Sequence, residues 1–538
     1  MTRAPDLHND IIAKKKDGIT AICVKYAFGF LLYFLLITHD LVNFADGLWE
    51  NPMYRAGEWE LSIGRWLLRY IDKVTGGIAV NPYVSIVSLF FFVLGLQVFW
   101  DMTGEKHGCF QDYLTSALFL ANPYVCSVLS YRYTALSYSI GFFLAVCSMR
   151  LILLSVRAEK KPALFLCLLS SVLIACCMAI YQTYLSVMIL LAVFGLYLLL
   201  FREKAENGKI LRYLISGFLT GSFGGIVYFL ILKAELHRYG VKLSKYKGAN
   251  SLSLTGLIKK APTSFREAYS YFVKYYNGAW NGFIQWNRFS SPKWMVILLL
   301  FALTVLLFLL IGGWKARKAA ALWLLPIAAL LPAIVHFTAF VLPEESGYLI
   351  QMSAPDALLN SMILALALME IPAFFEKQMH RRISLFLITA FGIFFLYGAA
   401  MQTVTDQQAM KEGLQADETL LRSITAELAG KGLYSDTYRY AIIGSPHDNP
   451  LLYTTPIYDR ANSYAKTADF SWARKDFWER GWNGLALYRL GIDLKKVKAK
   501  KYIRLKETDE EIAAMPAFPA EGSILVRKNV VIVKVSEY

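Results

Sequence analysis

This sequence has few charged residues. Only 18% of its 538 residues are Asp, Glu, Lys or Arg, whereas a soluble domain has about 25%. Hydrophobic residues make up 56% of the chain, and the mean hydropathy is +0.41. Such a composition excludes an ordinary soluble globular protein. Runs of roughly 20 apolar residues, which is the length that spans the hydrocarbon core of a bilayer, indicate a multi-pass membrane protein.

Several site motifs are also missing. The seven cysteines lie in or beside apolar runs without a Cys-x-x-Cys pair, so neither a zinc site nor a disulfide framework is indicated. No P-loop, dinucleotide-binding glycine fingerprint, Gly-x-Ser-x-Gly or metal-binding His pair occurs. These absences argue against nucleotide-driven transport and against a soluble nucleotide cofactor. The formal net charge of +16 comes with no nucleic-acid-binding motif, and no nucleic-acid partner is expected.

Apolar length and basic connectors predict eleven transmembrane helices in residues 1–401. The N-terminus, with Lys14 to Lys16, is expected in the cytoplasm, and two long external loops are expected at about 38–80 and 233–293. The expected spans are about 19–37, 81–100, 112–130, 134–155, 163–180, 183–201, 211–232, 294–313, 319–341, 356–374 and 383–401.

Residues 402–538 have an ordinary globular composition. They offer a helical opening at about 406–429, a strand-like YAIIG at 440–444, and the hairpin pattern SILVRKNVVIVKV. These features predict a small α/β domain. Since the number of spans is odd, the domain is expected outside the cell, opposite the N-terminus.

The first external loop gathers charge between two nearly uncharged spans. From Glu58 onward it has the pattern of an amphipathic helix, with apolar residues on one face and charged residues on the other. Such a helix suits the membrane interface. The apolar face comprises Trp59, Ile63, Trp66, Leu67 and Tyr70, and the opposite face comprises Glu58, Ser62, Arg65, Arg69 and Asp72.

An enzyme that acts on a lipid-linked sugar needs a carboxylate to deprotonate a hydroxyl and cations to hold the departing phosphate. Asp40 and Asp46 are candidates for the base, although Asp40 also suits a polar span end. Arg65 and Arg69 are spaced to engage one phosphate or to form ion pairs, and Arg132 suits a phosphate contact or interfacial anchoring. Gln182 is a candidate for sugar binding or for capping a hairpin.

Two local motifs, GEWELSIGRW in the first loop and IYQTYL between two spans, resemble the Gtr type II glucosyl transferases of bacterial membranes. Their wider relatives are the GT-C polytopic glycosyltransferases. The resemblance implies transfer of a sugar, commonly glucose, from a polyprenyl-phosphate carrier to a surface glycan, with inversion and a first-loop acid as base. The matching acids are Asp40 and Asp46, then Glu58 and Glu60; the GRW element matches Gly64, Arg65 and Trp66.

Relatives often have a paired Asp-Asp in that loop, whereas the aspartates here are separated. Some GT-C enzymes use a divalent cation such as Mg²⁺ or Mn²⁺, and this sequence identifies no site for one. The expected setting is the bacterial cytoplasmic membrane, where membrane lipid is a further partner. Two alternatives stay open: a flippase or exporter of lipid-linked sugars, and a glycan polymerase or ligase.

Overall fold

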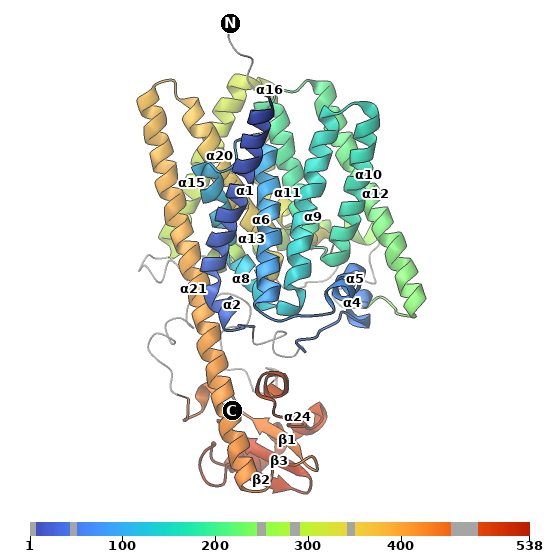
Figure 1. Ribbon diagram of the computed structural model, residues 1–538, viewed down its shortest axis with the longest axis vertical. Helices are drawn as coiled ribbons and strands as arrows, with labels where there is room; N and C mark the ends of the chain where they lie inside the picture. The colour runs from blue at the N-terminus through green and yellow to red at the C-terminus, as the bar shows by residue number, and fades with distance from the viewer. Residues whose placement is uncertain are drawn as a thin grey trace.

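A helical bundle with a small sheet beyond one end makes up the computed structural model, which describes residues 7–43, 51–244, 254–279, 291–341, 350–452 and 482–537 (Figure 1). Within these ranges, eight helices are long and apolar enough to cross a membrane. They are α6 (Tyr83–Thr103), α9 (Arg132–Arg157), α10 (Lys160–Ile180), α11 with its π-helical end (Tyr184–Arg202), α12 (Asn207–Tyr239), the apolar part of α15 (Ser291–Ala316), α20 (Ala354–Phe374) and α21 (Gln378–Gly430).

The third predicted span is a bent pair, α7 (Phe110–Leu120) and α8 (Pro123–Ser130), which meet at 51°. Pro123 stands in the first turn of α8, and the Asn122 side chain caps that helix by accepting from the Tyr124 N–H. A proline cannot continue the hydrogen bonding of the preceding helix, but it suits the first turn of a new one. The bend therefore follows from the Asn-Pro-Tyr triplet.

The first and ninth predicted spans are not continuous apolar helices. The first is divided at Tyr33 between α1 (Leu7–Leu32) and α2 (Phe34–Thr38). The ninth consists of short helices, in a stretch that contains Pro326 and Pro332. The described residues thus give eight candidate spans, or nine with the bent pair, where the sequence predicts eleven. The short helices are α16 (Lys318–Ala321), α17 (Leu324–Ala329), α18 (Leu331–Val335) and α19 (Thr338–Val341).

Helix α9 packs against α6, α10, α11 and α12. Small residues allow these close approaches. A Cβ added to Gly141 of α9 would lie 2.6 Å from the Tyr184 ring of α11, and one added to Gly95 of α6 would lie 2.7 Å from the Phe142 ring of α9. The first half of α9 is therefore packed closely between α6 and α11.

Helix α21 connects the bundle to the C-terminal sheet as one uninterrupted helix through the predicted domain boundary at 401 (Figure 1). The strands confirm the predicted strand and hairpin: β1 (Arg439–Ile443) pairs parallel with β3 (Val530–Lys534), which pairs antiparallel with β2 (Ile524–Arg527). Alternate residues of β3 pack on α24 (Ala499–Thr508) and on the end of α21. The sheet is thus the middle layer of a small α/β unit.

The first external loop does not contain the predicted continuous amphipathic helix. It forms α4 (Glu58–Ser62) and α5 (Trp66–Thr75), separated at Gly64, whose φ is +84°. Only glycine adopts such a backbone readily. The two predicted faces are therefore divided: Trp59 is 53% exposed, whereas Trp66 is 6% exposed. Both helices lie at the end of the bundle that faces the sheet, and α1 begins at the opposite end (Figure 1).

Candidate active site

Asp40 and Arg132, two residues singled out in the sequence, form an ion pair. Arg132 stands at the first position of α9, and its Nη1 donates to Asp40 Oδ2 over 2.9 Å. The Arg132 side chain is 3% exposed and that of Asp40 is 33% exposed. The Asn81 N–H also approaches Asp40 Oδ1, at 3.4 Å. A partly accessible carboxylate is thus held against a buried cation.

A second arginine reaches the same carboxylate from the C-terminal region. Arg489, in the π-helical turn η6 (Leu485–Arg489), donates from Nη1 to Asp40 Oδ2 at 3.2 Å and to the Asp40 backbone carbonyl at 2.7 Å. Its Nε donates to Glu418 of α21 at 3.0 Å. Asp40 itself has a φ of +46°. Non-glycine residues in this region are sparse and cluster at functional sites, where surrounding contacts hold them.

Arg65, in the first loop, contacts α9 at a different place from Asp40. Its Nη1 donates to the Tyr138 hydroxyl over 2.9 Å, and its guanidinium carbon lies 4.7 Å from the centre of the Tyr181 ring. The Tyr138 and Tyr181 rings are stacked, with centroids 4.5 Å apart. A guanidinium that contacts an aromatic face is attracted by the ring electrons. Arg65 therefore joins the first loop to both α9 and the end of α10.

Arg69 does not share the partners of Arg65. Its guanidinium carbon lies 3.7 Å from the centre of the Tyr239 ring, at the end of α12. Arg65 precedes α5 as its N-cap residue, with a non-helical backbone, so the two arginines are not one helical turn apart. The structure does not bring them together on one anion site.

The two motifs that carry the family resemblance contact each other. Gln182 Nε2 donates to the Ile63 carbonyl at 3.0 Å, and the Tyr228 hydroxyl of α12 donates to the Gly64 carbonyl at 3.0 Å. Trp66 packs in the same hydrophobic cluster as Tyr228. Gln182 and Trp66 thus dock the loop onto the α10–α11 hairpin and α12.

Because of these contacts, we expect Gly64→Ala to destabilise strongly the folded conformation of the first loop. A Cβ at Gly64 would lie 2.4 Å from the Tyr228 hydroxyl and 2.9 Å from Gln182 Nε2. The positive φ adds about 1–2 kcal/mol, and the clash requires the docked contacts to separate. We expect faster amide hydrogen exchange throughout residues 58–75 of the purified variant.

Two glycines of the same loop provide matched controls. Gly76 also has a positive φ, +69°, but a Cβ there meets nothing within 4 Å, and Gly57 has open space without a positive φ. Gly76→Ala should therefore show only the backbone cost, and Gly57→Ala should show neither effect. Equal exchange in the Gly64 and Gly76 variants would contradict a tight docking at Gly64.

The remaining first-loop acids have different surroundings. Glu60 is buried and accepts from the Tyr54 hydroxyl and, at 2.6 Å, from the Gly57 N–H, so its side chain caps the first turn of α4. Glu58 is exposed at the start of the same helix. Asp46 lies outside the described residues. Among the described acids of the first loop, Asp40 is therefore the one that forms ion pairs with arginine side chains.

Asp72 is a buried acid, although the helical pattern of the sequence places it on the charged face. Its Oδ2 accepts from the Ala56 N–H at 2.6 Å. Burial raises the pKa of Asp72 to about 6, while the hydrogen bond from Ala56 acts in the opposite direction. Asp72 and Arg132 line a common crevice with Tyr133, but its volume of about 10 Å³ is close to that of one water-sized sphere. The crevice is therefore too small for a sugar.

Two larger cavities lie among other helices of the bundle. Their volumes are about 340 Å³ and 190 Å³, and their linings share Phe272, Ala302, Leu331, Leu359 and Ile363. Phe272 belongs to α13 (Leu254–Ala279), so this part of the predicted second external loop lies within the bundle. The linings are almost entirely apolar and suit a hydrocarbon chain. Among the described residues that line them, none of the predicted site residues occurs.

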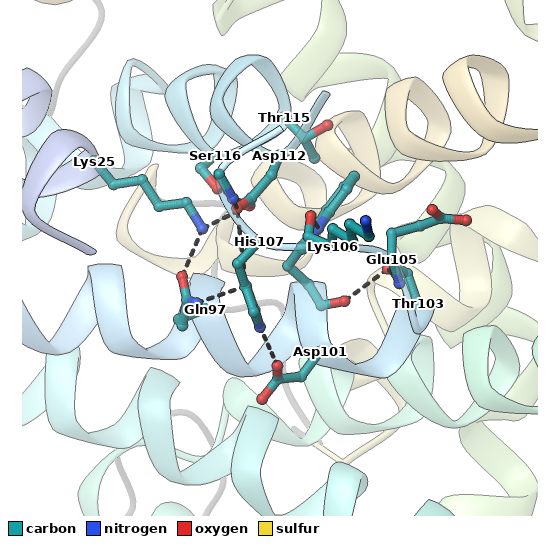
Figure 2. Close-up of polar contacts among 12 residues, drawn as sticks. Lys25, Gln97, Asp101, Thr103, Glu105, Lys106, His107, Asp112, Thr115 and Ser116 are labelled. Atoms are coloured by element: carbon teal, nitrogen blue, oxygen red, sulfur yellow. Dashed lines mark hydrogen bonds and ion pairs between the residues drawn. The ribbon is translucent and has the colours of Figure 1, made fainter. Parts of the chain in front are cut away.

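A second charged cluster lies among α1, α6 and α7 (Figure 2). Lys25 Nζ lies 2.6 Å from Asp112 Oδ1, and both side chains are buried. Lys25 also donates to Gln97 at 2.9 Å, and Gln97 contacts His107, which pairs with Asp101. Burial lowers the pKa of His107. Since the partners satisfy one another, this cluster joins helices and needs no substrate to explain it.

The surroundings of Asp40 do not fit a divalent cation. Its carboxylate faces two guanidinium groups, which repel a cation. Over the described ranges, no group of three or more His, Cys, Asp or Glu side chains is arranged to hold a metal ion. We therefore assign no chemical step to a metal.

Arg489 and Glu418 are the site residues that the sequence did not reveal. Arg489 is 449 positions from Asp40, and neither its neighbours nor its spacing mark it. The tail contains many Lys and Arg residues, so no local pattern separates this arginine from those on the domain surface.

Comparison with known proteins gives one family. A family model described as Glucosyl transferase GtrII matches residues 50–397, which is more than half of the chain. No curated protein and no solved structure matches significantly. The matched range includes the GRW element, Arg132 and Gln182, and it begins after Asp40.

Proposed function

The chain belongs to the glucosyl transferase GtrII family, and from this premise we propose that it transfers glucose from a polyprenyl-phosphate carrier to a cell-surface glycan. The reaction takes place on the outer side of the bacterial cytoplasmic membrane. Membership of this family is the evidence for transfer of glucose. The ion pair of Asp40 with Arg132 is the observation on which we base the position of the active site.

In the proposed reaction Asp40 is the general base. Its carboxylate takes the proton from an acceptor hydroxyl, whose oxygen attacks the anomeric carbon of glucose, and the bond to the carrier phosphate breaks. Inversion requires base and leaving group on opposite faces of the sugar. The sugar must therefore come between Asp40 and the guanidinium group of Arg132, which are paired at 2.9 Å in the structure.

Arg132 holds the carrier phosphate in this scheme. As the glycosidic bond breaks, the phosphate gains a second negative charge, and a fixed buried cation stabilises that charge. Arg132 meets this need because its side chain is 3% exposed and it stands at the N-terminus of the 26-residue helix α9, where the helix dipole also favours an anion.

The apolar cavities suit the isoprenoid chain of the carrier. Membrane lipid supplies the donor laterally, and a chain of this kind needs an apolar site within the bundle. The cavities between α11, α13, α15 and α20 have linings of that character. The C-terminal α/β unit stands at the end of the bundle that carries α4 and α5 (Figure 1), where an acceptor glycan would arrive.

A transfer assay separates this function from flipping, and from polymerisation or ligation. Purified protein in vesicles receives polyprenyl-phosphate-[¹⁴C]glucose and a short surface-glycan acceptor. We expect the label to move to the acceptor and to raise its mass by one hexose. Movement of the donor across the bilayer without transfer would contradict the proposal in favour of a flippase, and joining of glycan blocks would favour a polymerase or ligase.

A further inference from the structure

Two arginines from distant parts of the chain converge on one carboxylate oxygen. Arg132 approaches Asp40 Oδ2 at 2.9 Å and Arg489 approaches the same atom at 3.2 Å. Arg132 belongs to the helical bundle, whereas Arg489 follows β1 in the C-terminal unit. Guanidinium groups that converge in this way match the oxygens of a phosphate group.

We propose that Arg132 and Arg489 form the binding site for the carrier phosphate, and that the Asp40 carboxylate occupies this site when no donor is bound. This inference rests on the proposed function, which it deepens by assigning part of the active site to the C-terminal unit. Arg489 contacts the phosphate directly, and Arg132 is its partner.

The charges permit this exchange. Arg489 also pairs with Glu418, so the four groups Asp40, Glu418, Arg132 and Arg489 together are neutral. A sugar linked to polyprenyl phosphate is a phosphodiester with a single negative charge. It can therefore take the place of the Asp40 carboxylate between the guanidinium groups, so that one negative charge again faces them.

The exchange also links donor binding to release of the base. In the structure Asp40 Oδ2 accepts hydrogen bonds from both guanidinium groups. When the phosphate takes the guanidinium groups, Asp40 Oδ2 loses these donors and can accept a hydrogen bond from the acceptor hydroxyl. The product phosphate carries an additional charge and is bound more strongly than the donor, so both arginines favour bond cleavage.

The backbone contact of Arg489 gives it a second effect. Its Nη1 donates to the Asp40 carbonyl at 2.7 Å, next to a residue whose φ is +46°. A purely positioning role would act through this contact alone. It would change the rate of transfer without changing the affinity for a phosphate, and the test must separate the two.

The test measures equilibrium binding of radiolabelled polyprenyl phosphate to full-length protein in detergent, together with KM and kcat for transfer. We expect Arg489→Gln to weaken binding by about 10- to 100-fold, which is typical for loss of a hydrogen bond between charged groups. Arg489→Lys, which keeps the charge, should recover part of the affinity.

Arg527 provides the matched control. It is an arginine of the same C-terminal unit that pairs with Asp509 and Glu511, away from Asp40. Arg527→Gln should leave phosphate binding unchanged. Size-exclusion profiles and unfolding temperatures identify variants that misfold. If Arg489→Gln misfolds, phosphate binding of Arg489→Lys is compared with that of the wild type instead.

The outcomes are distinguishable. Wild-type affinity for polyprenyl phosphate in Arg489→Gln would overturn the inference, even if kcat fell, because Arg489 would then act only on the Asp40 backbone. The proposed function would survive that result. Conversely, phosphate binding that depends on Arg489 in a protein without glucosyl transfer would keep the anion site and overturn the proposed function.

Discussion

Asp40→Asn lowers kcat for glucosyl transfer by about 10²- to 10⁴-fold, the range that general-base catalysis contributes. The amide has nearly the shape of the carboxylate but cannot accept the acceptor proton. Since the variant also removes a negative charge from beside Arg132 and Arg489, polyprenyl phosphate should bind at least as tightly as in the wild type. The measurement is single-turnover transfer with saturating lipid-linked donor.

The controls for this prediction come from the same chain. Asp436 is an exposed acid that pairs with Lys495 on the C-terminal unit, and Asp436→Asn should transfer glucose at the wild-type rate. Asp46→Asn tests the other first-loop aspartate. Full transfer by Asp40→Asn together with loss of transfer by Asp46→Asn would reassign the base to Asp46.

Arg132→Gln should have an effect of similar size but a different character. It removes a buried cation and leaves Asp40 with one guanidinium partner. Removing one fixed donor from a negative charge that develops in the transition state lowers the rate by about 10²- to 10³-fold. The lost contact also weakens binding of the carrier phosphate, so we expect kcat/KM to fall by about 10²-fold or more.

Arg157 at the other end of α9 is the control for Arg132. It pairs with Glu203 and is 39% exposed, and Arg157→Gln should leave kcat/KM within about twofold, because exposed pairs contribute little. Arg132→Lys should recover less activity than its charge alone suggests, since lysine lacks the planar fork of donors. Wild-type kcat/KM in Arg132→Gln would remove Arg132 from the site.

Local pattern was enough to predict much of the fold. The apolar runs correctly predicted the helices α6, α9, α10, α11 and α20. Each of these is a single helix of membrane-spanning length. The alternating residues of SILVRKNVVIVKV predicted the β2–β3 hairpin. These elements depend on neighbouring residues, which the sequence displays directly.

Features that depend on distant contacts could not be predicted in the same way. The first-loop helix has an amphipathic pattern through Gly64, but contacts from Tyr228 and Gln182 hold that glycine at a positive φ. The prolines at 326 and 332 were visible, yet hydropathy alone favoured one continuous span. The fold extends α21 through residue 401, where the change in composition predicted a boundary.

The candidate site, like the fold, could be predicted only in part from local sequence. Charge density in a short loop identified Asp40, and the position at a span end identified Arg132, but nothing in the sequence indicated that they pair. Arg489 comes from a segment 449 residues away. Its approach to Asp40 requires the tertiary fold of α21 and the C-terminal unit, because that fold brings η6 back to the end of α1 and α2.

The binding position of the carrier phosphate is central to the proposed mechanism. A structure of the full-length protein with a non-transferable polyprenyl-phosphate-glucose analogue measures this directly. We predict phosphate oxygens about 2.7–2.9 Å from the guanidinium nitrogens of Arg132, with the Asp40 carboxylate displaced from that guanidinium group and the sugar between them. A phosphate bound at Arg65 or Arg69, with the pair of Asp40 and Arg132 intact, would contradict the account.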